Sequence, residues 1–142
     1  EIDIPAPDVN TNPQIMAWIA DTFVSTKSPN TRMQNLHVVT GKPVGSGGLE
    51  GRDRATGFGV VVALKQWAKI TNYDLKGKKY IVQGFGNVGY WTAHFMHELG
   101  VILTAVQDAS GTIYDESGID PAALQNHVLK NIILKKNMMN IY

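Results

Sequence analysis

The amino-acid sequence predicts an α/β fold that contains part of a doubly wound parallel sheet. Two observations lead to this prediction. A glycine-rich motif at 84–89 directly follows a short apolar segment, and the nearly continuous apolar segment 101–106 is typical of a parallel strand covered on both faces. The 142 residues are 44% hydrophobic, which is enough for a core and excludes wholesale disorder.

The first half of the chain alternates loops and helices. Residues 1–12 are rich in proline, asparagine and acids, which is typical of a loop. Pro13 fits a first helical position after a capping asparagine, and apolar residues at helical spacing predict a helix over 13–25. A glycine-rich loop follows at 37–52, and the apolar spacing over 54–71 predicts a second helix.

The second half follows a β-α-β pattern. Residues 80–82 predict a short strand, 87–98 a helix and 101–106 the second strand. Gly100 stands where a left-handed helix cap is expected. A minor strand is expected at 112–114, and Asp120 with Pro121 then begins another helix as its cap and first residue.

The glycine motif carries the main functional prediction. G-x-G-x-x-G between a strand and a helix is the fingerprint of a dinucleotide-binding Rossmann fold, because glycines permit the tight turn, the approach of a pyrophosphate and close helix packing. The helix start adds N–H groups and a partial positive charge for the phosphates. The alternative is a turn that binds nothing. The candidate cofactor-binding residues are Gly84, Phe85, Gly86, Asn87, Val88 and Gly89.

Asp108 is the candidate for the acid of this fingerprint. It lies 19 residues after Gly89, near the spacing of about 20 expected for an acid that binds the adenosine ribose. Alternatively it forms a turn in D-A-S-G. Residues 101–129 contain four acids and no lysine or arginine, so we expect repulsion of a 2′-phosphate and binding of NAD, with NADP possible if a basic residue elsewhere compensates.

Composition excludes several other classes of function. The formal net charge of +1 gives no long-range attraction to nucleic acid or to an anionic membrane, and no apolar run approaches the ~18 residues of a membrane span. Without cysteine there is no disulfide scaffold, thiolate zinc site or cysteine nucleophile. His94 and His97 have no evident third ligand, so we expect no metal site. Trp18, Trp67 and Trp91 are expected in the core.

Several motifs occur together in a fixed order: P-A-P-D at 5–8, T-G-K-P at 40–43, R-A-T-G at 54–57, the fingerprint at 84–89 and D-A-S-G-T-I-Y-D at 108–115. In this order the sequence closely resembles the glutamate dehydrogenases of the Glu/Leu/Phe/Val dehydrogenase superfamily, over about residues 1–128. The resemblance implies reversible oxidative deamination of L-glutamate to 2-oxoglutarate and ammonia, with hydride transfer to NAD or NADP. It also implies two domains around a cleft and a homo-oligomer, usually a hexamer.

The resemblance assigns roles to four residues. Asp8 matches the catalytic aspartate, which is chemically reasonable because deamination needs protons moved at the amino nitrogen. Thr40 and Thr56 match threonines on the nicotinamide side of the cleft, and Asn87 matches a cofactor-contacting asparagine. The alternatives are a turn-capping aspartate and ordinary loop or cap residues.

The resemblance also predicts what this chain lacks. The family's substrate lysines lie upstream of P-A-P-D, so we expect the isolated chain to be catalytically incomplete. Residues 1–48 are expected to end a substrate-binding and oligomerisation domain, and 49–142 to begin the Rossmann domain. The tail stops resembling the family near Leu129. A cytoplasmic location is expected, with small-molecule substrates and neither nucleic acid nor membrane as partners. A non-catalytic NAD-binding fragment, or a dehydrogenase of leucine, phenylalanine or valine, is the alternative.

Overall fold

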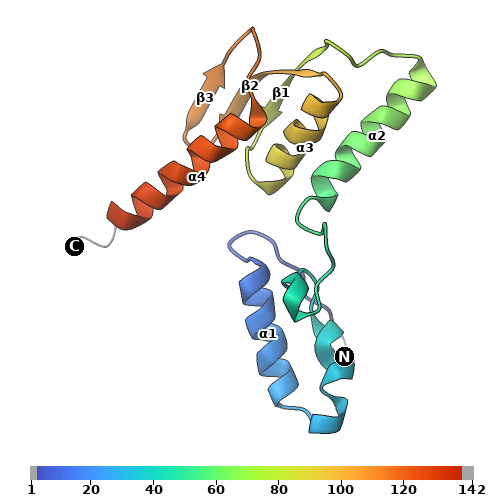
Figure 1. Cartoon of the computed structure of the whole chain (residues 1–142), viewed down its shortest axis with the longest axis vertical. Helices are drawn as coiled ribbons and strands as arrows, with labels where there is room; N and C mark the ends of the chain where they lie inside the picture. Colours follow the sequence, from blue (N-terminus) through green and yellow to red (C-terminus); the bar gives the residue numbers. More distant parts are fainter. Residues whose placement is uncertain (1–2, 139–142) are drawn as a thin grey trace. The chain divides into compact units, whose positions relative to one another are not determined.

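The structure is a computed structural model that describes residues 3–138. The chain divides into two compact units, Glu1–Asp53 (unit 1) and Arg54–Tyr142 (unit 2). Figure 1 shows the helices and strands of each unit, coloured from the blue N-terminal end to the red C-terminal end. Of the compositionally distinct tail, residues 139–142 lie outside the described residues.

Unit 1 is built on helix α1 (Pro13–Ser25), whose start is set by local chemistry. The side-chain oxygen of Asn12 accepts a hydrogen bond of 3.0 Å from the backbone N–H of Ile15. Pro13 follows at the first helical position, where its missing N–H costs no helical hydrogen bond. The predicted helix over 13–25 is confirmed.

The core of unit 1 forms between α1 and the short 3-10 helix η2 (Met33–Val38). Its buried side chains are Met16, Ala20, Val38 and Val39. Two further 3-10 turns, η1 (Pro29–Thr31) and η3 (Val44–Ser46), shape the remaining chain. Trp18 is 62% exposed, so its expected place in the core is wrong. It follows Met16 by two residues, which is about 200° around the helix and therefore the opposite face.

Unit 2 contains a three-stranded mixed sheet in the order β1-β2-β3. Strands β1 (Lys79–Gln83) and β2 (Ile102–Asp108) are parallel, and β3 (Gly111–Tyr114) is antiparallel to β2. Helix α3 (Asn87–Glu98) connects β1 to β2, so the predicted β-α-β pattern is confirmed. At the end of α3, Gly100 has φ of +72°, as its predicted left-handed cap requires.

Helices α3 and α4 (Pro121–Met138) cover the same face of the sheet, as Figure 1 shows. Tyr80 of β1 lies in this core, and its hydroxyl donates a hydrogen bond of 3.2 Å to the carbonyl of Ala93 in α3. Burial raises the pKa of Tyr80 to about 12, because the phenolate would lose its hydration. The core side chains are Phe85, Ala93, Leu103 and Val106, flanked by Tyr80, Val82, Tyr90, Ile119, Leu124 and Val128.

Helix α2 (Ala55–Thr71) packs against α3 through a glycine. A Cβ atom at Gly57 would lie 2.6 Å from the Cβ of Trp91 and 2.7 Å from the backbone nitrogen of Thr92. Gly57 lowers helix propensity but lets the two helices approach this closely. Trp67 on α2 is 47% exposed, and its ring contacts that of Tyr73 at a tilt of 50° with centroids 5.3 Å apart, so its expected core position is also wrong.

Candidate functional site

The candidate cofactor loop lies at the carboxyl end of the parallel strands, where α/β sheets bind ligands. Gly84 follows β1 with φ of +86°, a left-handed conformation that glycine adopts without strain. Its backbone N–H donates a hydrogen bond of 2.7 Å to the carbonyl of Gln107, the penultimate residue of β2. This bond brings the loop beside Asp108, which ends β2.

The other two fingerprint glycines have different surroundings. A Cβ atom at Gly86 would meet nothing within 4 Å, so this position is open to an approaching ligand. A Cβ atom at Gly89 would overlap the carbonyl oxygen of Gly84 and lie 3.2 Å from Cγ1 of Val82. Gly86 precedes α3 as its N-cap and provides no side-chain hydrogen bond to the helix start. The loop therefore combines an open approach with a closely packed helix, as a pyrophosphate site requires.

The remaining residues of the loop divide between core and surface. The side chain of Phe85 is buried in the core of unit 2, with its ring edge-on to Tyr90 at 6.1 Å, so only its backbone could contact a cofactor. Asn87 is the first residue of α3 and is exposed. Val88 is 43% exposed. The buried side chain of Phe85 thus attaches the loop to the core of unit 2.

Asp108 makes the turn that its surrounding sequence predicted. Its Oδ1 accepts hydrogen bonds from the backbone N–H of Ser110 at 2.7 Å and from the Ser110 hydroxyl at 2.6 Å. These bonds stabilise the short connection to Gly111, where β3 begins. Asp108 is the last residue of β2, whereas the sequence placed it just past the strand. The turn and the cofactor hypothesis are compatible, because this turn stands beside the glycine loop.

The other three acids of this segment lie elsewhere. Because β3 runs antiparallel to β2, the chain after Tyr114 returns toward the amino end of the parallel strands. Glu116 forms an ion pair of 3.0 Å with Lys79, the first residue of β1. The backbone N–H of Asp115 donates to the carbonyl of Thr104 in β2. Asp120 follows Ile119, whose N–H donates a bond of 2.7 Å to the carbonyl of Leu103, the second residue of β2. The sequence argument that four acids together repel a 2′-phosphate is therefore wrong, and the argument for NAD depends on Asp108.

The candidate catalytic residue Asp8 lies in an exposed turn of unit 1. Its carbonyl accepts hydrogen bonds from the backbone N–H of Thr11 at 3.0 Å and from the Thr11 hydroxyl at 2.8 Å. Its carboxylate Oδ1 accepts a bond of 2.8 Å from the N–H of Val9. Asn10, which lies between Asp8 and Thr11 in this turn, has φ of +59°. The turn fixes the backbone of Asp8 and presents its carboxylate at the surface.

Thr40 lies in the segment that supports this turn. Its backbone N–H donates a hydrogen bond of 3.0 Å to the carbonyl of Pro5. Gly41, at φ of +65°, packs so closely on Pro7 that a Cβ atom would lie 2.6 Å from the proline Cδ. The two motifs P-A-P-D and T-G-K-P, more than thirty residues apart in sequence, thus form one structural element, and Asp8 and Thr40 belong to it.

Thr56 belongs to unit 2, together with the glycine loop and Asp108. It is exposed in the first turn of α2, next to the Gly57 contact with α3. Local sequence signals do not reveal two features, one in each unit. In unit 2 the sequence gives no sign that Gly57 contacts α3. In unit 1 the burial of Lys42 has no sequence signal beyond the adjacent glycine-rich loop.

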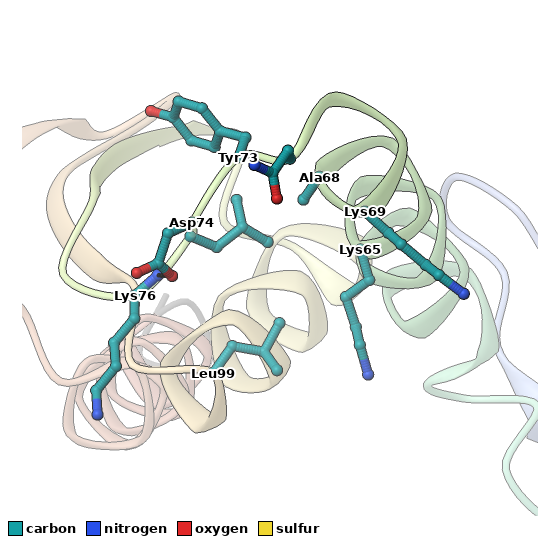
Figure 2. A pocket seen from close by; sticks show the side chains of 9 residues that line it. Lys65, Ala68, Lys69, Tyr73, Asp74, Lys76 and Leu99 are labelled. Carbon is teal, nitrogen blue, oxygen red and sulfur yellow. Dashed lines mark hydrogen bonds between the residues drawn. The ribbon is translucent and has the colours of Figure 1, made fainter.

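A surface hollow of about 470 Å³ lies away from all these residues (Figure 2). It is lined by the end of α2, the segment leading into β1 and Leu99, and so lies at the amino end of the parallel strands. In Figure 2 the side chains of Lys65 and Lys76 lie on opposite sides of the view and run in nearly the same direction, so their ammonium groups do not converge on one anion. The hollow is therefore not the candidate cofactor site.

Residues 3–138 contain no helix that is both long and apolar enough to cross a membrane. Within the same range, no three histidine, aspartate or glutamate side chains come together as metal ligands. His94 instead approaches Glu98, four residues later on α3, at 3.4 Å.

Comparison with known proteins gives consistent matches. A family model described as Glutamate/Leucine/Phenylalanine/Valine dehydrogenase matches residues 47–139. The NAD-specific glutamate dehydrogenase of Staphylococcus aureus (strain COL) is 45% identical over 118 residues, and the glutamate dehydrogenase of Aeropyrum pernix is 49% identical over 119 residues. These alignments cover 83% and 84% of this chain, and 28% of each relative.

Solved structures match in the same way. The hetero-hexameric glutamate dehydrogenase of Thermus thermophilus, in a Leu-bound form, superposes with a TM-score of 0.79 at 38% identity, over 88% of this chain and 29% of that one. The glutamate dehydrogenase of Peptoniphilus asaccharolyticus superposes with a TM-score of 0.71 at 42% identity, over 89% of this chain and 33% of that one. The predicted α/β class and partial Rossmann fold are thereby confirmed.

Proposed function

Because this chain belongs to the glutamate/leucine/phenylalanine/valine dehydrogenase family, we propose that it is part of an enzyme that reversibly deaminates L-glutamate to 2-oxoglutarate and ammonia with NAD. The chain spans about 28% of the length of the curated relatives that it matches. The proposal therefore concerns the activity of a whole enzyme to which these residues contribute.

The observation that carries the proposal is the glycine loop beside Asp108. The space beside Gly86 is free for a ligand, whereas the space beside Gly89 is filled by the Gly84 carbonyl. The hydrogen bond between Gly84 and Gln107 places the loop next to the end of β2. These residues fit NAD: the backbone at Gly86 and the start of α3 would hold the pyrophosphate, and the Asp108 carboxylate would accept hydrogen bonds from the adenosine ribose.

Unit 1 supplies the proton chemistry in this proposal. When bound, NAD would accept a hydride from the substrate carbon that carries the amino group. Water must then add at that carbon and ammonia must leave, and each step moves a proton at nitrogen or oxygen. The exposed carboxylate of Asp8 can accept and return such a proton. The hydroxyl of Thr40 in unit 1 and that of Thr56 in unit 2 are each candidate hydrogen-bond partners for the nicotinamide carboxamide.

The two units take different roles in this proposal. Unit 1 ends the substrate-binding domain, and unit 2 begins the nucleotide-binding Rossmann domain. The whole enzyme is a cytoplasmic homo-hexamer. The superposition with a hetero-hexameric enzyme of Thermus thermophilus supports a hexameric assembly.

We expect the purified whole enzyme to reduce NAD with L-glutamate at a kcat/KM at least ~100-fold above that with leucine, phenylalanine or valine. A site that binds a second carboxylate leaves its polar groups unpaired when an apolar side chain enters. Absorbance of NADH at saturating NAD measures these rates. A preference for an apolar amino acid would assign the enzyme to another branch of the family. NAD binding without turnover on any of the four would identify a binding protein.

The cofactor preference is tested by exchanging Asp108 for serine. Asp108→Ser removes a charged acceptor and a source of repulsion, so the NAD-to-NADP ratio of kcat/KM should fall at least ~10-fold. Asp115→Ser is the matched control, because Asp115 makes the same turn with Ser117, with Oδ1 bonds of 2.8 and 2.6 Å. The control should leave the ratio unchanged. An equal ratio in the Asp108 variant and the wild type would reduce Asp108 to a turn residue.

A further inference from the structure

Lys42 is a buried cation in unit 1. Only 8% of the residue is exposed, and the ammonium group donates a hydrogen bond to the backbone carbonyl of Val39. Val39 is itself 1% exposed and belongs to the core beneath α1. Burial of an ammonium group is unfavourable unless hydrogen bonds replace its water. A lysine whose only role is to keep the surface hydrated would be exposed, whereas Lys42 is buried and hydrogen-bonded.

The glycine-rich loop that follows folds over the Lys42 backbone and side chain. The N–H of Gly48 donates a bond of 3.0 Å to the carbonyl of Pro43, and the N–H of Gly47 donates one of 3.1 Å to Val44. A Cβ atom at Gly48 would overlap the Lys42 carbonyl oxygen, and one at Gly47 would lie 4.0 Å from the Lys42 Cε. Position 48 requires glycine because its backbone lies against the Lys42 carbonyl, and position 47 favours glycine because its φ is +82°.

A short chain of contacts connects Lys42 to Asp8. The ammonium bond holds the carbonyl of Val39, the residue directly before Thr40. Thr40 holds the carbonyl of Pro5 through its N–H, and Gly41 packs on Pro7. Asp8 follows Pro7 directly. Every contact in this chain lies within unit 1 and involves backbone or a rigid proline ring, so a displacement at Val39 is transmitted to the Asp8 turn.

We propose that Lys42 is a positioning residue for Asp8: its buried ammonium fixes the 39–41 segment against P-A-P-D and thereby sets where the Asp8 carboxylate stands. This inference rests on the proposed function, in which Asp8 transfers protons. Proton transfer needs heavy atoms within hydrogen-bond reach, and a misplacement of about 1 Å can lower a rate ~100-fold. Lys42 itself does not contact the substrate in this proposal.

The first experiment replaces Lys42 in the whole enzyme. Lys42→Met keeps the side-chain length and removes the donor, and Lys42→Gln keeps a polar head that is too short to hold the Val39 carbonyl. Both should lower kcat at least ~10-fold. Lys27→Met is the control, since Lys27 also contacts its own unit, 4.3 Å over the Phe23 ring, without touching the 39–41 segment. Its kcat should equal that of the wild type.

The second experiment combines Lys42→Met with Asp8→Asn. If Lys42 acts through Asp8, adding Lys42→Met to the Asp8→Asn variant should lower kcat by less than ~3-fold, because the effects of coupled residues are not additive. Equal losses in both backgrounds, or a folded Lys42 variant with wild-type kcat, would overturn the proposal. So would failure of both variants to fold, which would leave Lys42 a residue of the fold alone. Failure of the proposed function has a different signature, namely Asp8→Asn with unimpaired turnover.

Discussion

Replacing Asp8 by asparagine is expected to lower kcat of the whole enzyme at least ~100-fold, the usual contribution of a positioned acid–base group. The amide keeps the size of the side chain and an oxygen for the 2.8 Å bond from the N–H of Val9. It cannot accept and return a proton at neutral pH. NAD affinity should remain within twofold, because the proposal gives Asp8 a role in proton transfer and assigns NAD binding to other residues. Steady-state kinetics and NAD titration provide the two measurements.

Asp3→Asn is the matched control for this prediction. Asp3 is also exposed, and its Oδ1 accepts the same kind of bond, 2.8 Å from the N–H of the next residue, Ile4. The control should retain wild-type turnover. If Asp8→Asn retains more than a third of kcat, Asp8 is a turn residue and the proton carrier lies elsewhere in the enzyme.

Replacing Gly89 by alanine is expected to destabilise the enzyme by about 3 kcal/mol, which is at the upper end of the usual cost of overpacking. The added Cβ would overlap the Gly84 carbonyl oxygen. That backbone cannot move away cheaply, because the Gly84 N–H is bonded to Gln107 at 2.7 Å. Thermal and denaturant unfolding of the whole enzyme measure the loss.

Gly86→Ala is the companion variant with the opposite expectation. A Cβ atom there meets nothing within 4 Å, and φ of −85° suits alanine, so stability should change by less than about 0.5 kcal/mol. NAD affinity should fall at least ~10-fold, because the methyl group would stand where the pyrophosphate approaches. If Gly86→Ala bound NAD normally, the open position would not be the pyrophosphate site. A stable Gly89→Ala would show that the helix can shift away from the strand.

The sequence predicted those elements whose signals are local. Asn12 and Pro13 set the start of α1 within one helical turn, and the structure begins the helix at Pro13. The order of strand, glycine motif, helix and strand lies within thirty residues, and the structure reproduces it as β1, α3 and β2. Capping, turn formation and apolar spacing act between near neighbours, so the order of residues is sufficient to predict them.

Tertiary structure decided the positions that depend on distant contacts. Sequence proximity grouped Asp115 and Glu116 with Asp108, but the reversal of chain direction at β3 carries them to the other end of the sheet. Lys42 looks like a surface lysine in sequence, yet the loop after it closes over its side chain. Strand direction and close packing bring together or separate residues that are far apart or adjacent along the chain, and local sequence signals do not encode those distances.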